Sequence, residues 1–273
     1  MSLKNVKVLT VSQSIHPFLD EPEMATVARQ LPQGILESGN EIRVFMPKFG
    51  CINERRHQLH EVIRLSGMNL IINDTDHALL IKVASVPNVR MQVYFIDNEE
   101  YFKRKSTWLG KDGSFHPDND ERALFFCRGV LETVRKLGWV PDIIHMHGWM
   151  TAFLPLYIRR KFADDPHFEN AKLVFSVYDE KPEALDKDMV KKLTMEGFDP
   201  DLLKDLKKPT TEDLYRLGMD LSDAVVKGSP KLSKSLESAI RSTEKPVLAH
   251  PAADDLVSAH ADFYQSVLEE ALV

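Results

Sequence analysis

The sequence has few cysteines and no long apolar run. Cys51 and Cys127 are the two cysteines among 273 residues, too few and too far apart for a disulfide framework. No apolar stretch approaches the roughly 18–20 residues that span a bilayer. The N-terminus runs into a strand pattern without the apolar core of a signal peptide. We therefore expect a cytoplasmic protein with no membrane partner.

An excess of basic residues is also missing. The chain has 35 Lys and Arg against 41 Asp and Glu, which gives a net charge of −6. Non-specific nucleic-acid and membrane-surface binding need a basic surface, so neither partner is expected. With 43% hydrophobic and 28% charged residues, the composition is that of a globular protein long enough to bury a sizeable core.

Short apolar runs alternate with segments of helical periodicity, which is the pattern of βαβ units. The clearest strand runs are 7–11, 41–46, 142–146, 172–177 and 224–226. The clearest helices are 24–38, 119–137, 149–161 and 230–240. The predicted fold class is α/β, with a doubly wound, mostly parallel sheet. Ligands of such sheets bind beyond the carboxyl ends of the strands, so the loops that follow the strands are the candidate site.

Two excursions and a terminal helix interrupt this alternation. An antiparallel β excursion is expected over about 60–97, from three β-rich runs at 62–65, 78–83 and 91–96. Residues 179–221 carry many charges but keep apolar periodicity, so they predict a charged helical excursion. We expect a single domain over residues 1–250 and an amphipathic helix in 251–273 that packs on it.

The loop after the first strand, residues 12–23, lacks the glycines of a phosphate-binding loop. Where the first helix starts it carries Asp20, Glu21, Pro22 and Glu23 instead. Carboxylates at a helix N-terminus favour the helix by roughly 0.3–1 kcal/mol each, but they repel a diphosphate. We therefore expect this loop to cap a helix and not to hold phosphate.

His145, His147 and Gly148 lie where a strand ends and a helix starts. We expect the two histidines to point to opposite faces, with His145 in the core and His147 toward the ligand-binding edge. Gly148 permits an unusual dihedral angle or a close backbone approach. Two histidines without a nearby carboxylate or thiolate are too few for zinc, and neither a metal nor a cofactor is expected.

Two further loops offer candidate contacts to a ligand. Arg55 and Arg56 follow the second strand, where they would meet an anion or a sugar, although a solvated charge run is the simpler interpretation. Ser229 opens a late helix, where it would hold an anion or act as an N-cap. No Ser-His-Asp or Cys-His arrangement can be drawn from the spacing, so no catalytic residue is assigned.

Taken in order, five stretches resemble one family; they are 8–32, 42–50, 119–128, 141–152 and 222–230. They are similar to the N-terminal domain of bacterial glycogen synthases and plant starch synthases, glucosyltransferases that use ADP-glucose. The resemblance covers nearly residues 5–235 and implies a Rossmann-like sheet, the N-terminal half of a GT-B fold. It also implies transfer of glucose from ADP-glucose to an α-1,4-glucan, with an α-glucan or a nucleotide sugar as ligand.

The departures from the family fall on its chemistry. The family's Lys-x-Gly-Gly donor loop aligns with residues 20–23, where one charge is reversed and Pro22 removes a backbone donor. The family's His-Asp-Trp has its aspartate at Gly148, and Tyr178 stands where the family has a histidine. His147 and Tyr178 would still touch a sugar hydroxyl or stack on a glucan ring.

The resemblance leaves three functions open. The first is a glycogen/starch synthase-type glucosyltransferase domain that needs a separately encoded second domain, because the family's active site lies between two domains. The second is a non-catalytic descendant that binds glucan or a partner protein and regulates glycogen metabolism. The third is an enzyme that takes a phosphate-poor ligand in the same cleft. The terminal amphipathic helix would also suit a homo-oligomer contact.

Overall fold

The computed structural model describes residues 3–19, 23–204, 206 and 208–270. The strands are β1 (Lys7–Ser12), β2 (Glu41–Pro47), β3 (His60–Glu61), β4 (Met68–Ile72), β5 (Thr75–Ser85), β6 (Gln92–Asp97), β7 (Ile143–His147), β8 (Lys172–Val177), β9 (Ala224–Lys227) and β10 (Val247–Leu248). In these described residues they form a ten-stranded sheet in the order β10-β9-β8-β7-β1-β2-β6-β5-β3, and β4 pairs with β5 beside this path.

Pairing in the sheet is parallel from β10 through to β6. The antiparallel part is confined to β5 and its three partners β3, β4 and β6. The predicted α/β class with a doubly wound, mostly parallel sheet is thereby confirmed.

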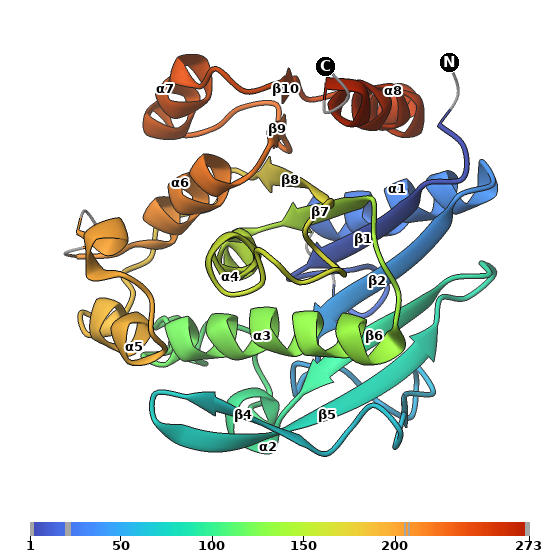
Figure 1. Cartoon of the computed structure of the whole chain (residues 1–273). Helices are drawn as coiled ribbons and strands as arrows, with labels where there is room; N and C mark the ends of the chain where they lie inside the picture. Colours follow the sequence, from blue (N-terminus) through green and yellow to red (C-terminus); the bar gives the residue numbers. More distant parts are fainter. Residues whose placement is uncertain (1–2, 20–22, 205, 207, 271–273) are drawn as a thin grey trace.

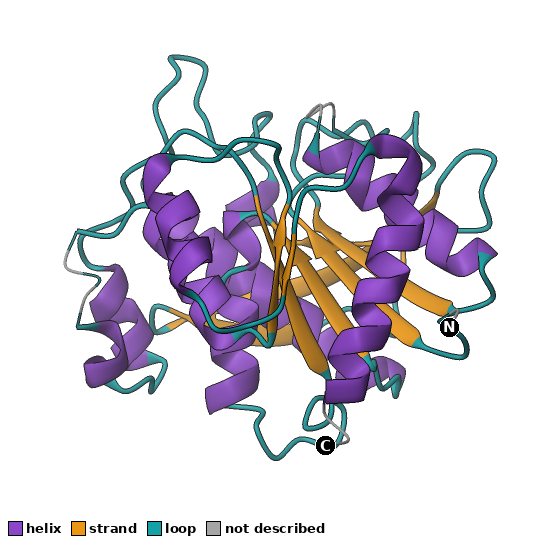
Figure 2. Ribbon diagram, turned by 90° about the horizontal axis from the view of Figure 1, so that it is seen from above, coloured by secondary structure: helices purple, strands orange, loops and turns teal. Residues whose placement is uncertain are grey.

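Helices cover both faces of the sheet. They are α1 (Met24–Glu37), α2 (Glu99–Phe102), α3 (Asn119–Leu137), α4 (Phe153–Arg160), α5 (Met189–Met195), α6 (Thr211–Leu221), α7 (Lys234–Ser242) and α8 (Leu256–Glu269). Short 3-10 turns lie at η1 (Trp149–Thr151), η2 (Pro200–Leu203) and η3 (Ala253–Asp255). Figure 1 shows α1 and α8 on one side of the central strands β7, β1 and β2, and α3 and α4 on the other, and Figure 2 shows the strands fanning out between helices. None of the helices described here is long and apolar enough to cross a membrane.

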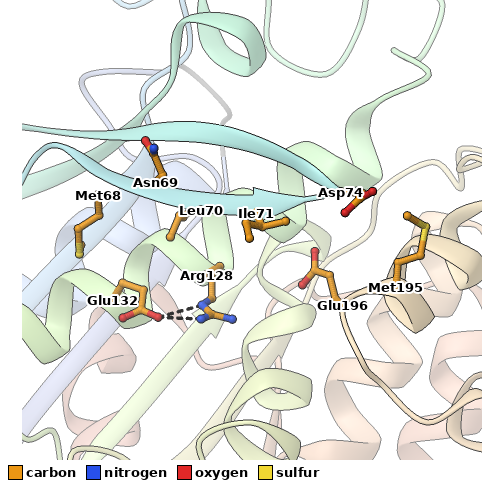
Figure 3. A pocket seen from close by; sticks show the side chains of 9 residues that line it. All are labelled: Met68, Asn69, Leu70, Ile71, Asp74, Arg128, Glu132, Met195 and Glu196. Carbon is orange, nitrogen blue, oxygen red and sulfur yellow. Dashed lines mark hydrogen bonds and ion pairs between the residues drawn. The ribbon is translucent and has the colours of Figure 1, made fainter.

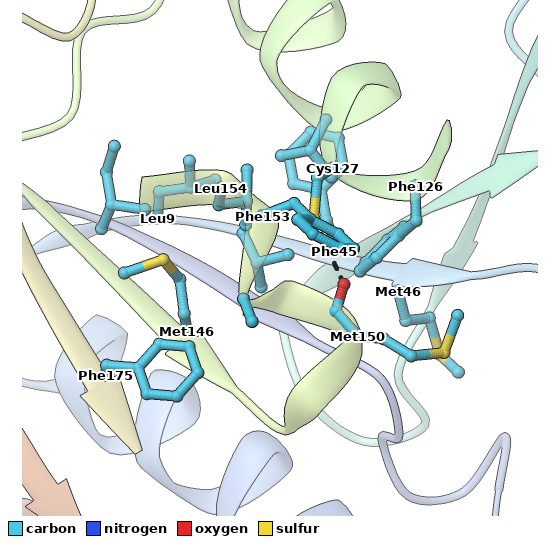
Figure 4. Packing of buried hydrophobic residues seen from close by; sticks show 14 of the residues in the cluster. Leu9, Phe45, Met46, Phe126, Cys127, Met146, Met150, Phe153, Leu154 and Phe175 are labelled. Carbon is cyan, nitrogen blue, oxygen red and sulfur yellow. Dashed lines mark hydrogen bonds between the residues drawn. The ribbon is translucent and has the colours of Figure 1, made fainter. Parts of the chain in front are cut away.

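The main core lies between the central parallel strands and the helices α3 and α4. Parallel strands are buried on both faces, which explains why β1, β7 and β8 are continuous apolar runs. Phe45, Phe126 and Phe153 are fully buried beside Cys127, whose thiol donates to the Met150 carbonyl oxygen at 3.2 Å (Figure 4). Burial raises the pKa of the Cys127 thiol, so this cysteine is a packing residue.

The antiparallel region differs in detail from the sequence prediction. The run at 62–65 is a turn, with Ile63 83% exposed, and the strand lies instead at β4. Asn73 and Asp74, both with positive φ, close the β4–β5 hairpin in the manner of a type I′ turn and so set its register. The run at 91–96 is a strand, but β6 also joins the parallel ladder through β2.

Residues 179–221 are tied to the rest of the molecule by a buried ion-pair network. Lys192 of α5 reaches Asp120 and Glu121 of α3 at 2.9 and 2.7 Å, and Asp186 at 2.8 Å. Lys192 is 6% exposed and Asp120 is fully buried, so loss of either partner would leave an uncompensated buried charge. The charged segment is therefore packed structure and not a linker.

Candidate functional site

Six polar side chains meet near the carboxyl ends of β7 and β8, beneath α8. This strand-end cluster consists of His145, His147, Ser176, Tyr178, His260 and Tyr264. The two strands are neighbours in register, with His145 opposite Val174 and His147 opposite Ser176. All six side chains are buried, so the cluster belongs to the interior in this conformation.

Hydrogen bonds between rings and hydroxyls hold the cluster together. His145 Nδ1 lies 2.6 Å from the Tyr264 hydroxyl, and its Nε2 lies 2.7 Å from Ser176 Oγ. His147 Nδ1 lies 2.8 Å from the Tyr178 hydroxyl. Both nitrogens of His145 are thus engaged, whereas His147 Nε2 is buried and has no hydrogen-bond partner in the part of the chain that the structure describes.

The two histidines of β7 share one face, so the expectation that they point to opposite faces is wrong. Their ring centroids are 4.0 Å apart, and both rings are fully buried. Residues two apart in a strand lie on the same side, and that side is the one that α8 covers. His147 therefore does not lie at an open edge of the sheet.

Burial keeps the histidines of the cluster neutral. It lowers the pKa of His147 to about 3 and that of His260 to about 4, and it holds the pKa of His145 well below its usual range. Neighbouring imidazoles add to the shifts of His145 and His147. Neutral rings of this kind accept or donate hydrogen bonds but supply no positive charge for a phosphate.

Gly148 follows β7 with φ +88° and ψ 161°, a backbone conformation that side chains rarely adopt. A Cβ at this position would lie 2.5 Å from Cδ of Gln13. The Gln13 Oε1 accepts from the Met150 backbone N–H at 3.1 Å, and its Nε2 donates to Glu180 at 2.8 Å. Gln13 therefore bridges three loops and fills the space that a side chain at position 148 would need.

Glu180 completes this Gln13 bridge. Its carboxyl also accepts a hydrogen bond from the Tyr215 hydroxyl. Burial raises the pKa of Glu180 to about 7, although the hydrogen bonds from Tyr215 and Gln13 act against the shift. A carboxyl held in this way is fixed by its neighbours and is not directed at open space.

Glu23, at the start of α1, closes the other side of the cluster. Its carboxylate accepts from the Ser229 hydroxyl, and Ser229 Oγ in turn accepts from the Asp179 backbone N–H at 3.1 Å. Glu23 also lies 3.9 Å from His250 Nε2. The expected capping of α1 is not seen for Glu23, which makes no side-chain cap hydrogen bond.

Ser229 does not cap a helix either. The N-cap of α7 is Ser233, whose hydroxyl accepts from the Leu236 N–H. Ser229 is 3% exposed and serves instead as the link between the end of β9 and the start of α1. The rest of the acidic loop, Asp20, Glu21 and Pro22, lies outside the described residues.

Little free space remains between these groups. The cavity bounded by Tyr178, Gly228, His250, Leu256 and His260 has a volume of about 10 Å³. That is close to the minimum for one water molecule. A sugar or a nucleotide does not fit beside the strand-end cluster in this conformation.

Arg55 and Arg56 lie outside the strand-end cluster. Both are exposed on a turn after β2, and the backbone N–H of Arg56 donates to Asn53 at 3.0 Å. The neighbouring His57 ring packs on Phe18, with centroids 5.0 Å apart. The structure thus brings His147, Gly148, Tyr178, Ser229 and Glu23 together but leaves the two arginines at the surface.

Sequence reasoning did not single out Gln13, Glu180, His250 or His260 for the site. His260 and Tyr264 stand on the apolar stripe of the terminal helix, and a polar residue in a buried stripe is a usable signal of a buried partner. Gln13 and Glu180 carry no local signal, because their roles depend on loops that are distant in the sequence.

A separate, larger pocket lies between β4, α3 and the end of α5 (Figure 3). This outer pocket has a volume of about 640 Å³ and is lined by Met68, Asn69, Leu70, Ile71, Asp74, Arg128, Glu132, Met195 and Glu196. Arg128 is held by Glu132 at 2.9 Å. Glu196 accepts from Tyr157, and burial raises its pKa to about 7.

No group of three or more His, Cys, Asp or Glu side chains is placed to hold a metal ion in the part of the chain that the structure describes. Cys51 is exposed, and Cys127 is buried in the core. The chemistry that the strand-end cluster supports is hydrogen bonding by neutral rings and hydroxyls.

The chain is similar to proteins of known activity. The model of a family described as the starch synthase catalytic domain matches residues 7–243. A glycogen synthase of Chlorobaculum parvum is 33% identical over 240 residues, which are 87% of this chain and 49% of that protein. A glycogen synthase of Chlorobium limicola is 40% identical over 179 residues, 65% of this chain and 37% of that protein. The chain thus spans about half or less of the length of these relatives.

The fold is shared with a solved plant enzyme. The catalytic domain of starch synthase IV from Arabidopsis thaliana, bound to ADP and acarbose, superposes with a TM-score of 0.73 at 18% identity. The match covers 90% of this chain and 51% of that one, and at this identity it shows the fold alone. Together with the match over residues 7–243, the sequence and the architecture show that this chain belongs to the starch synthase catalytic domain family, as a domain of the glycogen/starch synthase type.

Proposed function

We propose that this chain works in α-glucan synthesis as a glycogen/starch synthase-type glucosyltransferase domain, with ADP-glucose as donor and an α-1,4-glucan as acceptor. The observation that carries the proposal is family membership over residues 7–243, most of the chain. His147 and Tyr178 are the residues that would meet a sugar hydroxyl, because they lie at the end of β7 and just after β8.

The proposed activity requires a second domain and an opened strand-end cluster. Free space beside Tyr178 is about 10 Å³, which is too small for a sugar ring. That domain would correspond to the half of the relatives that this chain does not match. We expect the protein to act in the cytoplasm.

A second candidate is a non-catalytic descendant that binds an α-glucan or a partner protein and regulates glycogen metabolism. Two observations favour it: Glu23 is engaged with Ser229, and Gln13 fills the space beside Gly148. By the family resemblance, Asp20 stands where the family has a lysine, and Pro22 and Glu23 stand where it has two glycines. Removing the positive charge and adding a negative one would each weaken diphosphate binding by on the order of 1–3 kcal/mol.

Glucose transfer separates the two candidates. The purified chain is mixed with labelled ADP-glucose and glycogen, alone and with the half of the Chlorobaculum parvum enzyme that this chain does not match. Label incorporated only in the mixture supports the glucosyltransferase domain. The control is the same mixture with a Tyr178→Ala chain, which should incorporate less label.

Calorimetry with ADP-glucose tests the non-catalytic candidate directly. No heat of binding at micromolar donor with the wild-type chain, and measurable binding after Asp20→Lys, would support it, because the substitution restores the family's positive charge. Micromolar binding by the wild-type chain would instead exclude the non-catalytic candidate.

A further inference from the structure

One side of the strand-end cluster is covered by a continuous segment, residues 247–269, which comprises β10, η3 and α8 and is here termed the cover. We propose that acidification releases the cover, because positive charge then appears on the histidines buried beneath it. The release itself does not depend on the proposed function. The further step, that release controls the access of a ligand to His147 and Tyr178, does rest on it.

The cover makes direct contact with the cluster. The Tyr264 hydroxyl of α8 lies 2.6 Å from His145 Nδ1, and the His260 ring centroid lies 5.7 Å from that of His145. Leu256 and His260 form the same cavity wall as Tyr178 and Ser176. Movement of the cover would therefore expose the hydroxyl of Tyr178 and the rings beside it.

The remaining attachment of α8 is apolar. It packs on α1, where a Cβ at Gly34 would lie 2.7 Å from Cγ1 of Val257, so the two helices approach closely. Tyr264 and Val267 are buried on the inner side of α8, along with His260. Apolar packing of this kind does not change with pH, which leaves the histidines as the pH-dependent part of the contact.

Two of the cluster's ring nitrogens have no hydrogen-bond partner among the described residues. His147 Nε2 and His260 Nε2 are buried without a hydrogen-bond partner. His260 Nδ1 faces the Leu256 carbonyl at 2.8 Å, so the neutral ring donates there and its Nε2 is an unused acceptor. Protonation would place a donor and a positive charge on such a nitrogen, with no acceptor in reach among the described residues. A buried, unpaired charge of this kind destabilises the closed conformation.

The charged groups around the cluster do not compensate such a charge. Around it lie His145 and His147 from β7, Tyr178 after β8, Lys227 from β9, and His250, His260 and Tyr264 from the cover. The carboxylates in this part of the described structure are engaged elsewhere: Glu23 with Ser229, and Glu180 with Gln13 and Tyr215. His250 Nε2 of the cover faces Glu23 at 3.9 Å, and this pair lies nearer the surface than the cluster.

The direction of the pH effect follows from the pKa values. Burial lowers the pKa of His260 to about 4 and that of His147 to about 3, against about 6.5 for an exposed histidine. The closed cover is thus fully stable above pH 6.5 and loses stability as the pH falls toward 4. Each histidine that becomes exposed favours the open form by about 30-fold at pH 5 relative to pH 7.5.

Hydrogen–deuterium exchange of the whole chain tests the release without any ligand. Exchange is followed at pH 7.5 and pH 5.0, with labelling times corrected for the chemical exchange rate. We expect protection of residues 256–269 to fall by about 30-fold or more at pH 5.0, while protection of residues 119–137 in α3 stays unchanged. Equal protection of α8 at both values would overturn the proposal.

His260→Phe provides the decisive variant, since it keeps the ring volume and removes the titrating group. On acidification, the fall in exchange protection of α8 should be about 30-fold smaller in this variant than in the wild type. The matched control is His60→Gln on the exposed strand β3, which should keep the full acid effect. A His260→Phe chain that still shows the full effect would also contradict the proposal. Should that variant be poorly folded, Tyr264→Phe is the second: its α8 should be less protected at both pH values.

Ligand binding is measured separately, so that the two hypotheses can fail independently. If exchange shows release at pH 5.0 and neither maltoheptaose nor ADP-glucose binds there, even when the half of the Chlorobaculum parvum enzyme that this chain does not match is added, the proposed function is contradicted and the release stands. If a ligand binds while α8 stays protected, access does not pass through the cover.

Discussion

The strand-end cluster and the outer pocket differ in the space that they leave free. The cluster, where ligands of this sheet class bind, encloses about 10 Å³, whereas the outer pocket holds about 640 Å³. Both contain groups with shifted pKa values, lowered for His147 and raised for Glu196. Burial favours the neutral form in each case, so a shifted pKa here reports packing, and the free volume distinguishes the two regions.

The largest effect is expected at Gly148, next to the cluster. Gly148→Ala should lower the free energy of unfolding by about 3 kcal/mol or more, because it adds a clash with Gln13 to the strain of a positive φ. The measurement is urea denaturation. Gly39→Ala is the matched control, since Gly39 has the same φ of +88° with nothing within 4 Å, and should cost about 1–2 kcal/mol. Equal losses for the two variants would contradict this prediction, because they would show that the space beside Gly148 is not tightly filled by Gln13.

An intermediate effect with a pH dependence is expected in the outer pocket. The pKa of Glu196 is raised in the folded state, so its neutral form stabilises the protein at low pH and that stability is lost as the pH rises through about 7. Glu196→Gln should therefore raise the free energy of unfolding by about 1–2 kcal/mol at pH 8 and leave it unchanged at pH 5. Thermal and urea unfolding at both pH values give the comparison.

Glu54 supplies the control of opposite sign. Despite partial burial, hydrogen bonds from Lys48 and Lys82 lower the pKa of its carboxyl. Its stabilising effect is present at neutral pH and lost in acid, so Glu54→Gln should destabilise the protein at pH 8. The same sign for both variants would mean that burial does not determine the titration of Glu196.

The smallest effect is expected at the rim of the outer pocket. Ile71 is 65% exposed, so Ile71→Ser should change the free energy of unfolding by less than about 0.5 kcal/mol. Its neighbour Leu70 is 5% exposed, and Leu70→Ser should cost about 3 kcal/mol. Urea midpoints of the two variants measure the difference. A large loss for Ile71→Ser would show that the pocket is part of the core.

Much of the fold follows from local pattern. Apolar runs at 7–11 and 172–177 and the helical spacing over 119–137 predict β1, β8 and α3 closely, because burial on both faces of a parallel sheet demands such runs. The error at 62–65 arises because β propensity does not determine pairing, and the turn at 73–74 sets the register of the hairpin.

The candidate site was predictable only in part. Its location at strand ends is a prediction from the fold class, and the sequence and its family resemblance named His147, Gly148 and Tyr178 as candidates there. Their contact with a ligand stays a prediction. The prediction that His145 and His147 point to opposite faces was wrong. The strand period of two would have placed both side chains on the same face. Gln13 and Glu180 could not be found, since their bond joins residues 167 positions apart.

The acidic loop at 12–23 shows where the limit lies. From the sequence alone, the absence of glycines and the carboxylate at position 23 determine that this loop is unlike a phosphate-binding loop. Only the tertiary structure decides that Glu23 reaches Ser229, 206 positions away, and that α8 covers the histidines of β7. The physical reason is that composition and spacing govern local conformation, whereas burial and hydrogen-bond partners depend on which distant segments the fold brings into contact.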